Sequence, residues 1–244
     1  MAEQRAATAV LIVVLLPALA GCTVPVNWFG RHPPASPTPR PTTWEGDTSA
    51  AAKAFEEGRL EEAERQLEVA RERAASSKDN DLEVATSLVN LAVVRRAQGD
   101  AAGALDLQKE ALGIRERRLG PNHPDVASSL NSVAALYAAQ DDYRAAEPLL
   151  TRALAIREEA LGADDRHTAQ SLNNLGLLYA AEGRYADAEP LYQRAVTIFE
   201  RQPDAALATA LENYAALLEE TGRADAAAAM ETRARAVRVT NPGK

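Results

Sequence analysis

The sequence predicts an all-α protein, a right-handed α-solenoid of about five helix-turn-helix repeats. A leucine recurs in phase, since Leu88, Leu130 and Leu172 stand 42 residues apart and Leu211 follows 39 residues later. The chain is rich in alanine and only 5% aromatic, which suits close helix packing because alanine has the best helix propensity while strands favour aromatic residues. Several other positions recur with the same phase, as expected for a repeat array.

Each copy has the same internal order of residue types. The first expected helix places a large apolar residue before a small one, at Leu91-Ala92, Val133-Ala134, Leu175-Gly176 and Tyr214-Ala215. A turn follows at Gly58, Gly99, Gly183 and Gly222, with Asp141 in the equivalent place of the third copy. The second expected helix carries a small residue that faces the first, at Ala63, Ala104, Ala146, Ala188 and Ala227. The earliest copy, from Ala50, is worn and is expected to lack a full first helix.

These features resemble the tetratricopeptide repeat, in the 42-residue variety typified by kinesin light chain. The resemblance is most specific in the two central copies, which keep Tyr137, Tyr143, Tyr179, Tyr185 and the AEPL segments at Ala146 and Ala188. The other copies depart at the tyrosine positions, with Arg95 and Ala101 in the second and Leu218 and Ala224 in the fifth. The resemblance implies an array over residues 48–239, in copies at about 48–80, 81–123, 124–165, 166–203 and 204–239, followed by a tail at 240–244.

The first 21 residues predict a lipoprotein signal peptide. An apolar run from Ala6 to Ala18 follows Arg5, and this length fits an export signal better than a membrane span. The run ends in Leu19-Ala20-Gly21-Cys22, which resembles the bacterial lipobox. That resemblance implies cleavage after Gly21 and acylation of Cys22, including a palmitate-type chain. The alternatives are an ordinary signal peptide with an incidental cysteine and an uncleaved anchor.

Residues 22–47 predict a proline-rich tether between the lipidated cysteine and the array. Its prolines, at 25, 33, 34, 37, 39 and 41, exclude helix and discourage sheet. Both tryptophans, Trp28 and Trp44, fall in this segment, and we interpret them as linker residues. Trp28 is also close enough to the lipid to reach the headgroups.

Composition and motifs argue against catalysis, metal binding and nucleic-acid binding. The net charge of -8 leaves no basic domain for nucleic acid, and the single cysteine excludes an intrachain disulfide. His123, Asp164, Asp165 and His167 lack the helical or CxxC spacing of a metal site, so we interpret the histidines as loop and cap residues. We find no catalytic or phosphate-binding motif, and we predict neither an enzyme nor a bound metal or cofactor.

Function is therefore expected from a surface. In the family that the chain resembles, the concave groove is lined by first helices, often with an asparagine just before the large apolar residue. The matching and neighbouring positions here predict a partner-binding groove at Asn90, Asn131, Asn173, Asn174 and Asn213. Positions that would clamp a terminal carboxylate are uncharged, at Thr86, Val93, Ser128, Ala135, Gln170, Leu177, Thr209 and Ala216. Two interpretations of the asparagines stay open, namely contact with a partner and hydrogen bonding that only holds the superhelix.

We predict a scaffold or assembly factor of the bacterial cell envelope, anchored by lipid on Cys22 and binding an extended peptide or a partner protein. In a Gram-negative cell the expected place is the outer membrane, facing the periplasm. The alternative is an accessory lipoprotein of polysaccharide export or cell-wall binding. The sequence does not identify the partner or the oligomeric state.

Overall fold

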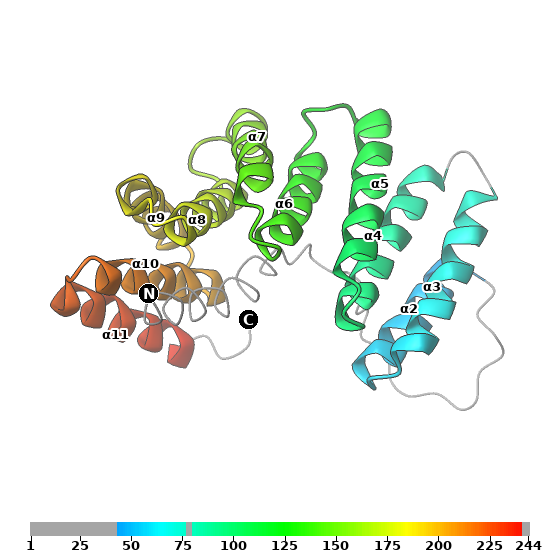
Figure 1. Ribbon diagram of the computed structural model, residues 1–244, viewed down its shortest axis with the longest axis horizontal. Coiled ribbons are helices and arrows are strands. Elements are labelled where there is room, and N and C mark those ends of the chain that lie inside the picture. Colours follow the sequence, from blue (N-terminus) through cyan, green and yellow to red (C-terminus); the bar gives the residue numbers. More distant parts are fainter. Residues whose placement is uncertain (1–42, 77–79, 241–244) are drawn as a thin grey trace. The chain divides into compact units, whose positions relative to one another are not determined.

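The computed structural model describes residues 43–76 and 80–240 (Figure 1). Ten helices lie within these residues, and they form five consecutive pairs. The helices are α2 (Trp44–Glu56), α3 (Leu60–Ala75), α4 (Asp81–Ala97), α5 (Ala101–Leu119), α6 (Pro124–Ala138), α7 (Tyr143–Leu161), α8 (Arg166–Ala181), α9 (Tyr185–Phe199), α10 (Ala205–Glu220) and α11 (Ala224–Thr240). The predicted all-α fold of helix-turn-helix repeats is confirmed, and no helix among the described residues has the length and apolar character needed to cross a membrane.

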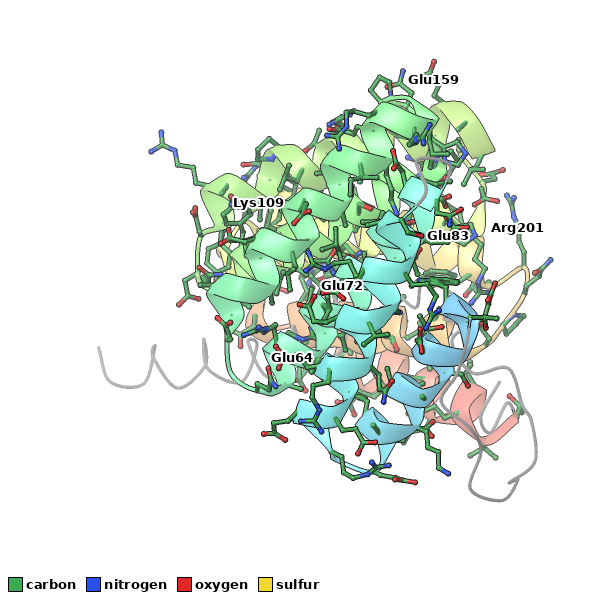
Figure 2. All side chains as sticks on the ribbon, turned by 90° about the vertical axis from the view of Figure 1, so that its right-hand side faces the viewer. Glu64, Glu72, Glu83, Lys109, Glu159 and Arg201 are labelled. Atoms are coloured by element: carbon green, nitrogen blue, oxygen red, sulfur yellow. The ribbon has the colours of Figure 1, made fainter. Side chains whose placement is uncertain are left out.

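The chain forms two compact units, which divide between Ser129 and Leu130 within α6. We call the described residues up to Ser129 the N-terminal unit and residues 130–240 the C-terminal unit. In the N-terminal unit α2, α3, α4 and α5 pack consecutively (Figure 1). Charged side chains project from these helices, including Glu64 and Glu72 on α3 and Lys109 on α5 (Figure 2). In the C-terminal unit α7 packs on α8, α8 on α9, and α9 on α10.

The cores explain the alanine-rich composition. The predicted small residues of the second helices, from Ala63 to Ala227, are all completely buried. In the N-terminal unit Ala51, Ala54 and Ala63 surround Leu67, Leu91 and Val94 in one cluster. In the C-terminal unit a larger cluster is centred on α8 and α9 and includes Leu150, Leu178 and Tyr192. Alanine at these places lets helix axes approach closely, so a few leucines and one tyrosine fill the remaining space.

The turn between the two helices of a pair needs a left-handed residue, and Asp141 shows that glycine is not essential there. Four pairs use a glycine with φ between 73° and 87°, whereas the α6–α7 turn uses Asp141 with φ of 59°. Among the described residues Asp141 is the only one other than glycine with a positive φ. Aspartate tolerates this conformation better than most residues, and its carboxylate accepts a hydrogen bond from the Tyr143 hydroxyl at 2.9 Å. The turn predicted at Asp141 is therefore confirmed.

The first pair starts earlier and is more complete than the sequence predicts. Helix α2 begins at Trp44 rather than near residue 48, because the Thr43 hydroxyl caps it by accepting a hydrogen bond from the Gly46 N–H at 3.1 Å. Trp44 is thus a helical residue and not a linker residue, and its indole N–H donates to Ser87 Oγ at 2.9 Å. The first copy has a 13-residue first helix after all. Trp28, Cys22 and the predicted signal peptide lie outside the described residues.

An ion pair between a buried aspartate and an exposed arginine explains why the first copy appears worn. Asp47 occupies the place that Leu88, Leu130 and Leu172 take in later copies. Its side chain is only 2% exposed, and it accepts a hydrogen bond from Arg73 Nε at 2.7 Å. An ionic pair thus replaces an apolar core position in the terminal repeat, where a polar edge is expected to favour solubility.

Candidate functional site

The five predicted groove asparagines all lie on first helices and all are buried. Asn90 is on α4 in the N-terminal unit, and the other four are on α6, α8 and α10 in the C-terminal unit. Their exposed fractions are 7% for Asn90, 0% for Asn131, 6% for Asn173, 0% for Asn174 and 3% for Asn213. The structure therefore groups them by helix but leaves little of their surface open to solvent.

Within the C-terminal unit these amides connect neighbouring first helices. Asn131 Nδ2 on α6 donates to Ser171 Oγ on α8 at 3.4 Å. Asn213 Nδ2 on α10 donates to Asn173 Oδ1 on α8 at 3.0 Å. The Oδ1 atoms of Asn131 and Asn213 are buried without a hydrogen-bond partner. The asparagines thus hold α6, α8 and α10 side by side. This structural contact is present whether or not a partner binds.

Four residues that lie one helical turn from these asparagines are partly exposed, whereas Leu177 at the matching place on α8 is buried. They are Ala135 on α6, Gln170 on α8, and Thr209 and Ala216 on α10, and we call them, with the asparagines of α6, α8 and α10, the first-helix face. None of the four is charged. Spacings of three and four residues place side chains on the same side of a helix, so these residues share the side that the asparagines occupy. A partner meeting this face would contact small and neutral polar groups.

Two arginines that the sequence reasoning missed, one partly buried and one fully buried, reinforce the junctions between successive repeats. In the N-terminal unit Arg115 Nη1 donates to Ser129 Oγ at 2.7 Å, and burial lowers the pKa of Arg115. In the C-terminal unit Arg157, only 3% exposed, donates to Ser171 Oγ at 3.0 Å and to the His167 carbonyl at 2.9 Å. A signal was present, since both the arginines and the serines stand 42 residues apart. Ser171 therefore serves both Arg157 and Asn131.

A second recurrent contact ties a glutamate on a second helix to an arginine of the next repeat. The glutamate directly follows the buried alanine of each helix, and the pairs are Glu64–Arg95 at 2.5 Å, Glu147–Arg184 at 3.1 Å and Glu189–Arg223 at 2.8 Å. The Arg184 guanidinium also lies 3.9 Å from the centre of the Tyr179 ring, a cation–π contact. Hydrogen bonds to carboxylates raise the pKa of Arg184, and the hydrogen bond from Arg223 lowers the pKa of Glu189.

The two histidines of the array have structural surroundings. His123 Nδ1 accepts a hydrogen bond from the Asp125 N–H at 3.1 Å, so His123 caps the start of α6. His167 lies in the first turn of α8, where its backbone N–H donates to Asp165 Oδ1 at 2.7 Å. The interpretation as a cap residue therefore holds for His123, whereas His167 lies inside α8 rather than in a loop and the cap of that helix is Asp165. Among the described residues, no group of three or more histidine, cysteine and acidic side chains is arranged to hold a metal ion.

The repeated helix pairs, their shared small residues and the aligned first helices define a helical-repeat protein of the kind that serves as a scaffold for protein–protein interaction. The tetratricopeptide repeat model matches residues 48–117, 83–159 and 167–238. These matches cover more than half of the chain, which therefore belongs to the tetratricopeptide repeat family, and its repeats are like those of kinesin light chain.

Solved structures show the same fold. BtubC (BKLC) from P. vanneervenii has a TM-score of 0.73 and 24% identity, over 82% of this chain and 81% of that one. A putative kinesin light chain from Podosopora anserina, with nearly identical TPR-like repeats, has a TM-score of 0.65 and 22% identity, over 78% and 92%. A Rap protein complexed with Competence and Sporulation Factor has a TM-score of 0.67 and 18% identity, over 80% of this chain and 54% of that one. No curated protein matches the sequence.

Proposed function

We propose that the protein is a scaffold or assembly factor of the bacterial cell envelope that binds an extended peptide or a partner protein on its first-helix face. The observation that carries this proposal is the alignment of α6, α8 and α10 by buried amides, which creates a fixed surface in a chain of an interaction family. One structural neighbour, the Rap protein, is itself complexed with Competence and Sporulation Factor.

The chemistry of the first-helix face indicates how the partner is recognised. Gln170 and Thr209 are polar and uncharged, and Ala135 and Ala216 are small. Without a lysine or arginine among them, the face offers no clamp for a terminal carboxylate. An amide and a hydroxyl pair instead with backbone N–H and C=O groups, and the alanines leave room for a chain to approach. An internal extended segment therefore fits this face better than a free C-terminus.

Thr209→Arg tests this face against a closely matched control, Thr197→Arg. Both threonines lie within helices and donate to the carbonyl four residues before them, at 3.0 Å for Thr209 and 2.9 Å for Thr197. Thr209 is on α10 in the first-helix face, whereas Thr197 is exposed on the second helix α9. We expect proteins captured from detergent-solubilised envelopes to be lost with Thr209→Arg and retained with Thr197→Arg. Equal capture by both variants would show that the partner binds elsewhere, and retention on peptidoglycan or polysaccharide alone would favour the cell-wall function.

Asn174→Ala separates the two interpretations of the asparagines. A direct contact predicts a several-fold to tenfold loss of affinity with the melting temperature kept, because each hydrogen bond contributes about 0.5–1.5 kcal/mol. A purely structural role predicts a lower melting temperature and an unchanged affinity per folded molecule. The complete burial of Asn174 favours the structural result, with the partner contacting the exposed residues beside it.

The membrane anchor is a separate part of the proposal and rests on the sequence alone. Leu19-Ala20-Gly21-Cys22 supports lipidation at Cys22, and Thr23 rather than aspartate after the cysteine supports the outer membrane in a Gram-negative cell. Metabolic labelling with a palmitate analogue tests this directly. We expect Cys22→Ser to abolish labelling and to leave the precursor uncleaved, whereas equal labelling of the variant would exclude lipidation at this residue.

A further inference from the structure

Helix α10 adds negative charge beside the first-helix face. Glu212 lies between Thr209 and Ala216, two residues of this face, and the spacings of three and four residues place all three on one side of α10. Glu219 and Glu220 follow Ala216 by one helical turn on the same side, and both are exposed. The repeat-equivalent places on α6 and α8 hold only uncharged residues, namely Asn131, Ala138, Ala139, Asn173, Ala180 and Ala181. At these places the negative charge is therefore confined to α10.

Glu212 already binds a guanidinium. Arg238, in the last turn of α11, donates from Nε to Glu212 Oε1 at 2.8 Å and from Nη2 to Glu212 Oε2 at 2.7 Å. Two parallel hydrogen bonds of this kind match a planar guanidinium to a carboxylate, which an ammonium group cannot do. The Arg238 and Glu212 side chains are 50% and 42% exposed, and an ion pair this open to solvent contributes little to folding.

Replacement of Arg238 at Glu212 requires only the movement of a side chain. Helix α11 stays packed on α10 through Ala227 and Ala234, which are at most 1% exposed, and through Met230 in the adjoining apolar clusters (Figure 1). The Arg238 guanidinium can therefore turn into solvent while α11 remains in place. A second guanidinium that takes its position on Glu212 restores both hydrogen bonds, so the carboxylate is not left unpaired.

We propose that the segment that binds the first-helix face carries an arginine, and that this arginine replaces Arg238 on Glu212. The inference rests on the proposed function, because it names the side-chain chemistry of the segment bound there. The uncharged part of the segment contacts α8 beside Gln170, and its arginine contacts α10. Glu219 and Glu220 make the potential around Glu212 more negative, which favours the approach of a cation. The face thus selects a neutral extended segment with one basic end.

Selection of random peptides displayed on phage, against the full-length protein in detergent, tests this preference. We expect the wild-type protein to select peptides with an arginine. Glu212→Lys reverses the charge at this place and should select aspartate or glutamate instead. The matched control is Glu200→Lys, because Glu200 is also 42% exposed and also pairs with an arginine of α11, Arg233, but belongs to the second-helix side at the end of α9. This control should still select arginine.

Titration with one selected peptide measures the exchange itself. Replacing the arginine of the peptide by glutamine should weaken binding about tenfold, because hydrogen bonds to a charged group are lost. Arg238→Gln should strengthen binding of the arginine peptide about two- to fivefold, because the competing guanidinium is gone. Arg233→Gln should leave the affinity unchanged. A purely structural ion pair predicts instead that Arg238→Gln lowers the melting temperature without strengthening binding.

The proposal is overturned if the wild-type protein and Glu212→Lys select the same peptides, or if Arg238→Gln does not strengthen binding. Should Glu212→Lys lose its helical circular dichroism signal, Glu212→Gln decides, since it should bind the arginine and glutamine peptides equally. Thr209→Arg distinguishes a failure of the proposed function. If it abolishes binding of peptides that lack arginine, the face binds a partner without this exchange. If it leaves selection unchanged, or if no peptide is selected at all, the first-helix face is not the binding site and both proposals fail.

Discussion

The α4–α5 and α8–α9 pairs have the same frame and differently filled interiors. Both keep a buried alanine at the start of the second helix and another seven residues later, at Ala104 and Ala111 in one pair and at Ala188 and Ala195 in the other. One turn after the first alanine the interior holds Gln108 in α5 and Tyr192 in α9. The alanines fix the distance between the two helices, and the residue between the alanines decides how completely the space between the helices is filled.

The facing residue on the first helix matches the filling residue. Opposite Tyr192, α8 has Gly176, and a Cβ on Gly176 would lie 3.0 Å from Tyr192 Cε1. The α4–α5 and α6–α7 pairs have Ala92 and Ala134 at the place of Gly176. The absence of a side chain at Gly176 thus leaves room for the Tyr192 ring, and the two residues pack directly against each other. Burial of this ring also raises the pKa of Tyr192.

The largest expected difference comes from truncating the filling residue in each pair. Tyr192→Ala should lower the free energy of unfolding by about 3–5 kcal/mol, because it leaves a cavity of ring size in a closed core. Gln108→Ala should cost about 1 kcal/mol or less, since it removes an unsatisfied acceptor together with its packing. Urea denaturation of the two variants measures both values. Similar losses would mean that Gln108 packs as well as Tyr192 does.

A smaller effect is expected from filling the space opposite the ring. Gly176→Ala should destabilise by about 1–3 kcal/mol, because the buried ring cannot move away from the new methyl group, although alanine is the better helix former. Adding Tyr192→Leu should recover much of the lost stability. The double variant then has the combination of the α6–α7 pair, in which Leu150 packs at the place of Tyr192 and Ala134 at the place of Gly176. Thermal unfolding of the single and double variants tests the coupling. Additive losses would show that the two positions do not interact.

Alkaline pH should separate the two units through their tyrosines. All six tyrosines lie between residues 137 and 214, within the C-terminal unit. Burial and the hydrogen bond to Asp141 raise the pKa of Tyr143 to about 12, and burial also raises the pKa values of Tyr179, Tyr185 and Tyr214. The folded state therefore holds these protons more tightly than the unfolded chain does.

The stability that results is fully present below about pH 10, the ordinary tyrosine pKa, and is lost as the pH rises from about 10 to 12. Denaturation at pH 8 and pH 11, followed by tyrosine absorbance, should show this loss for the C-terminal unit. In a Trp28→Phe background the Trp44 emission reports the N-terminal unit, which has no tyrosine among residues 43–129 and should lack this contribution. An equal loss in both units would point to a cause other than the tyrosines.

How far the sequence predicts the structure depends on the range of the contacts involved. The turn at Asp141 was predictable because both the copy phase and the local backbone preference of aspartate indicate it. The start of α2 was not, because prolines dominate the preceding segment and Asp47 interrupts the leucine pattern that marks a first helix. An aspartate is accommodated at position 47 because it pairs with Arg73, which lies 26 residues further along the chain. No local pattern reveals such a partner.

The candidate site shows the same limit. Repeat phase correctly placed the asparagines together on first helices, because residue spacing fixes the side of a helix that a residue occupies. The lateral hydrogen bonds depend on how closely α6, α8 and α10 approach, which spacing within one helix does not determine. The hydrogen bonds that Ser171 accepts from Asn131 and Arg157 therefore cannot be predicted from residue spacing.

The smallest expected difference between the two pairs concerns one serine position, which serves different partners in each. Ser87 on α4 accepts a hydrogen bond from the Trp44 indole at 2.9 Å, while Ser171 on α8 accepts from Arg157 at 3.0 Å. Removing Ser171 leaves a buried guanidinium short of an acceptor, so Ser171→Ala should cost about 1.5–3 kcal/mol. Removing Ser87 leaves only a partly buried neutral N–H, so Ser87→Ala should cost about 0.5–1.5 kcal/mol. Thermal unfolding of both variants, with Trp44 emission recorded in a Trp28→Phe background, measures the difference. If Trp44 emission does not change while helix is lost, the indole does not pack on α4. If both variants lose the same free energy of unfolding, the charge on Arg157 does not strengthen its hydrogen bond to Ser171.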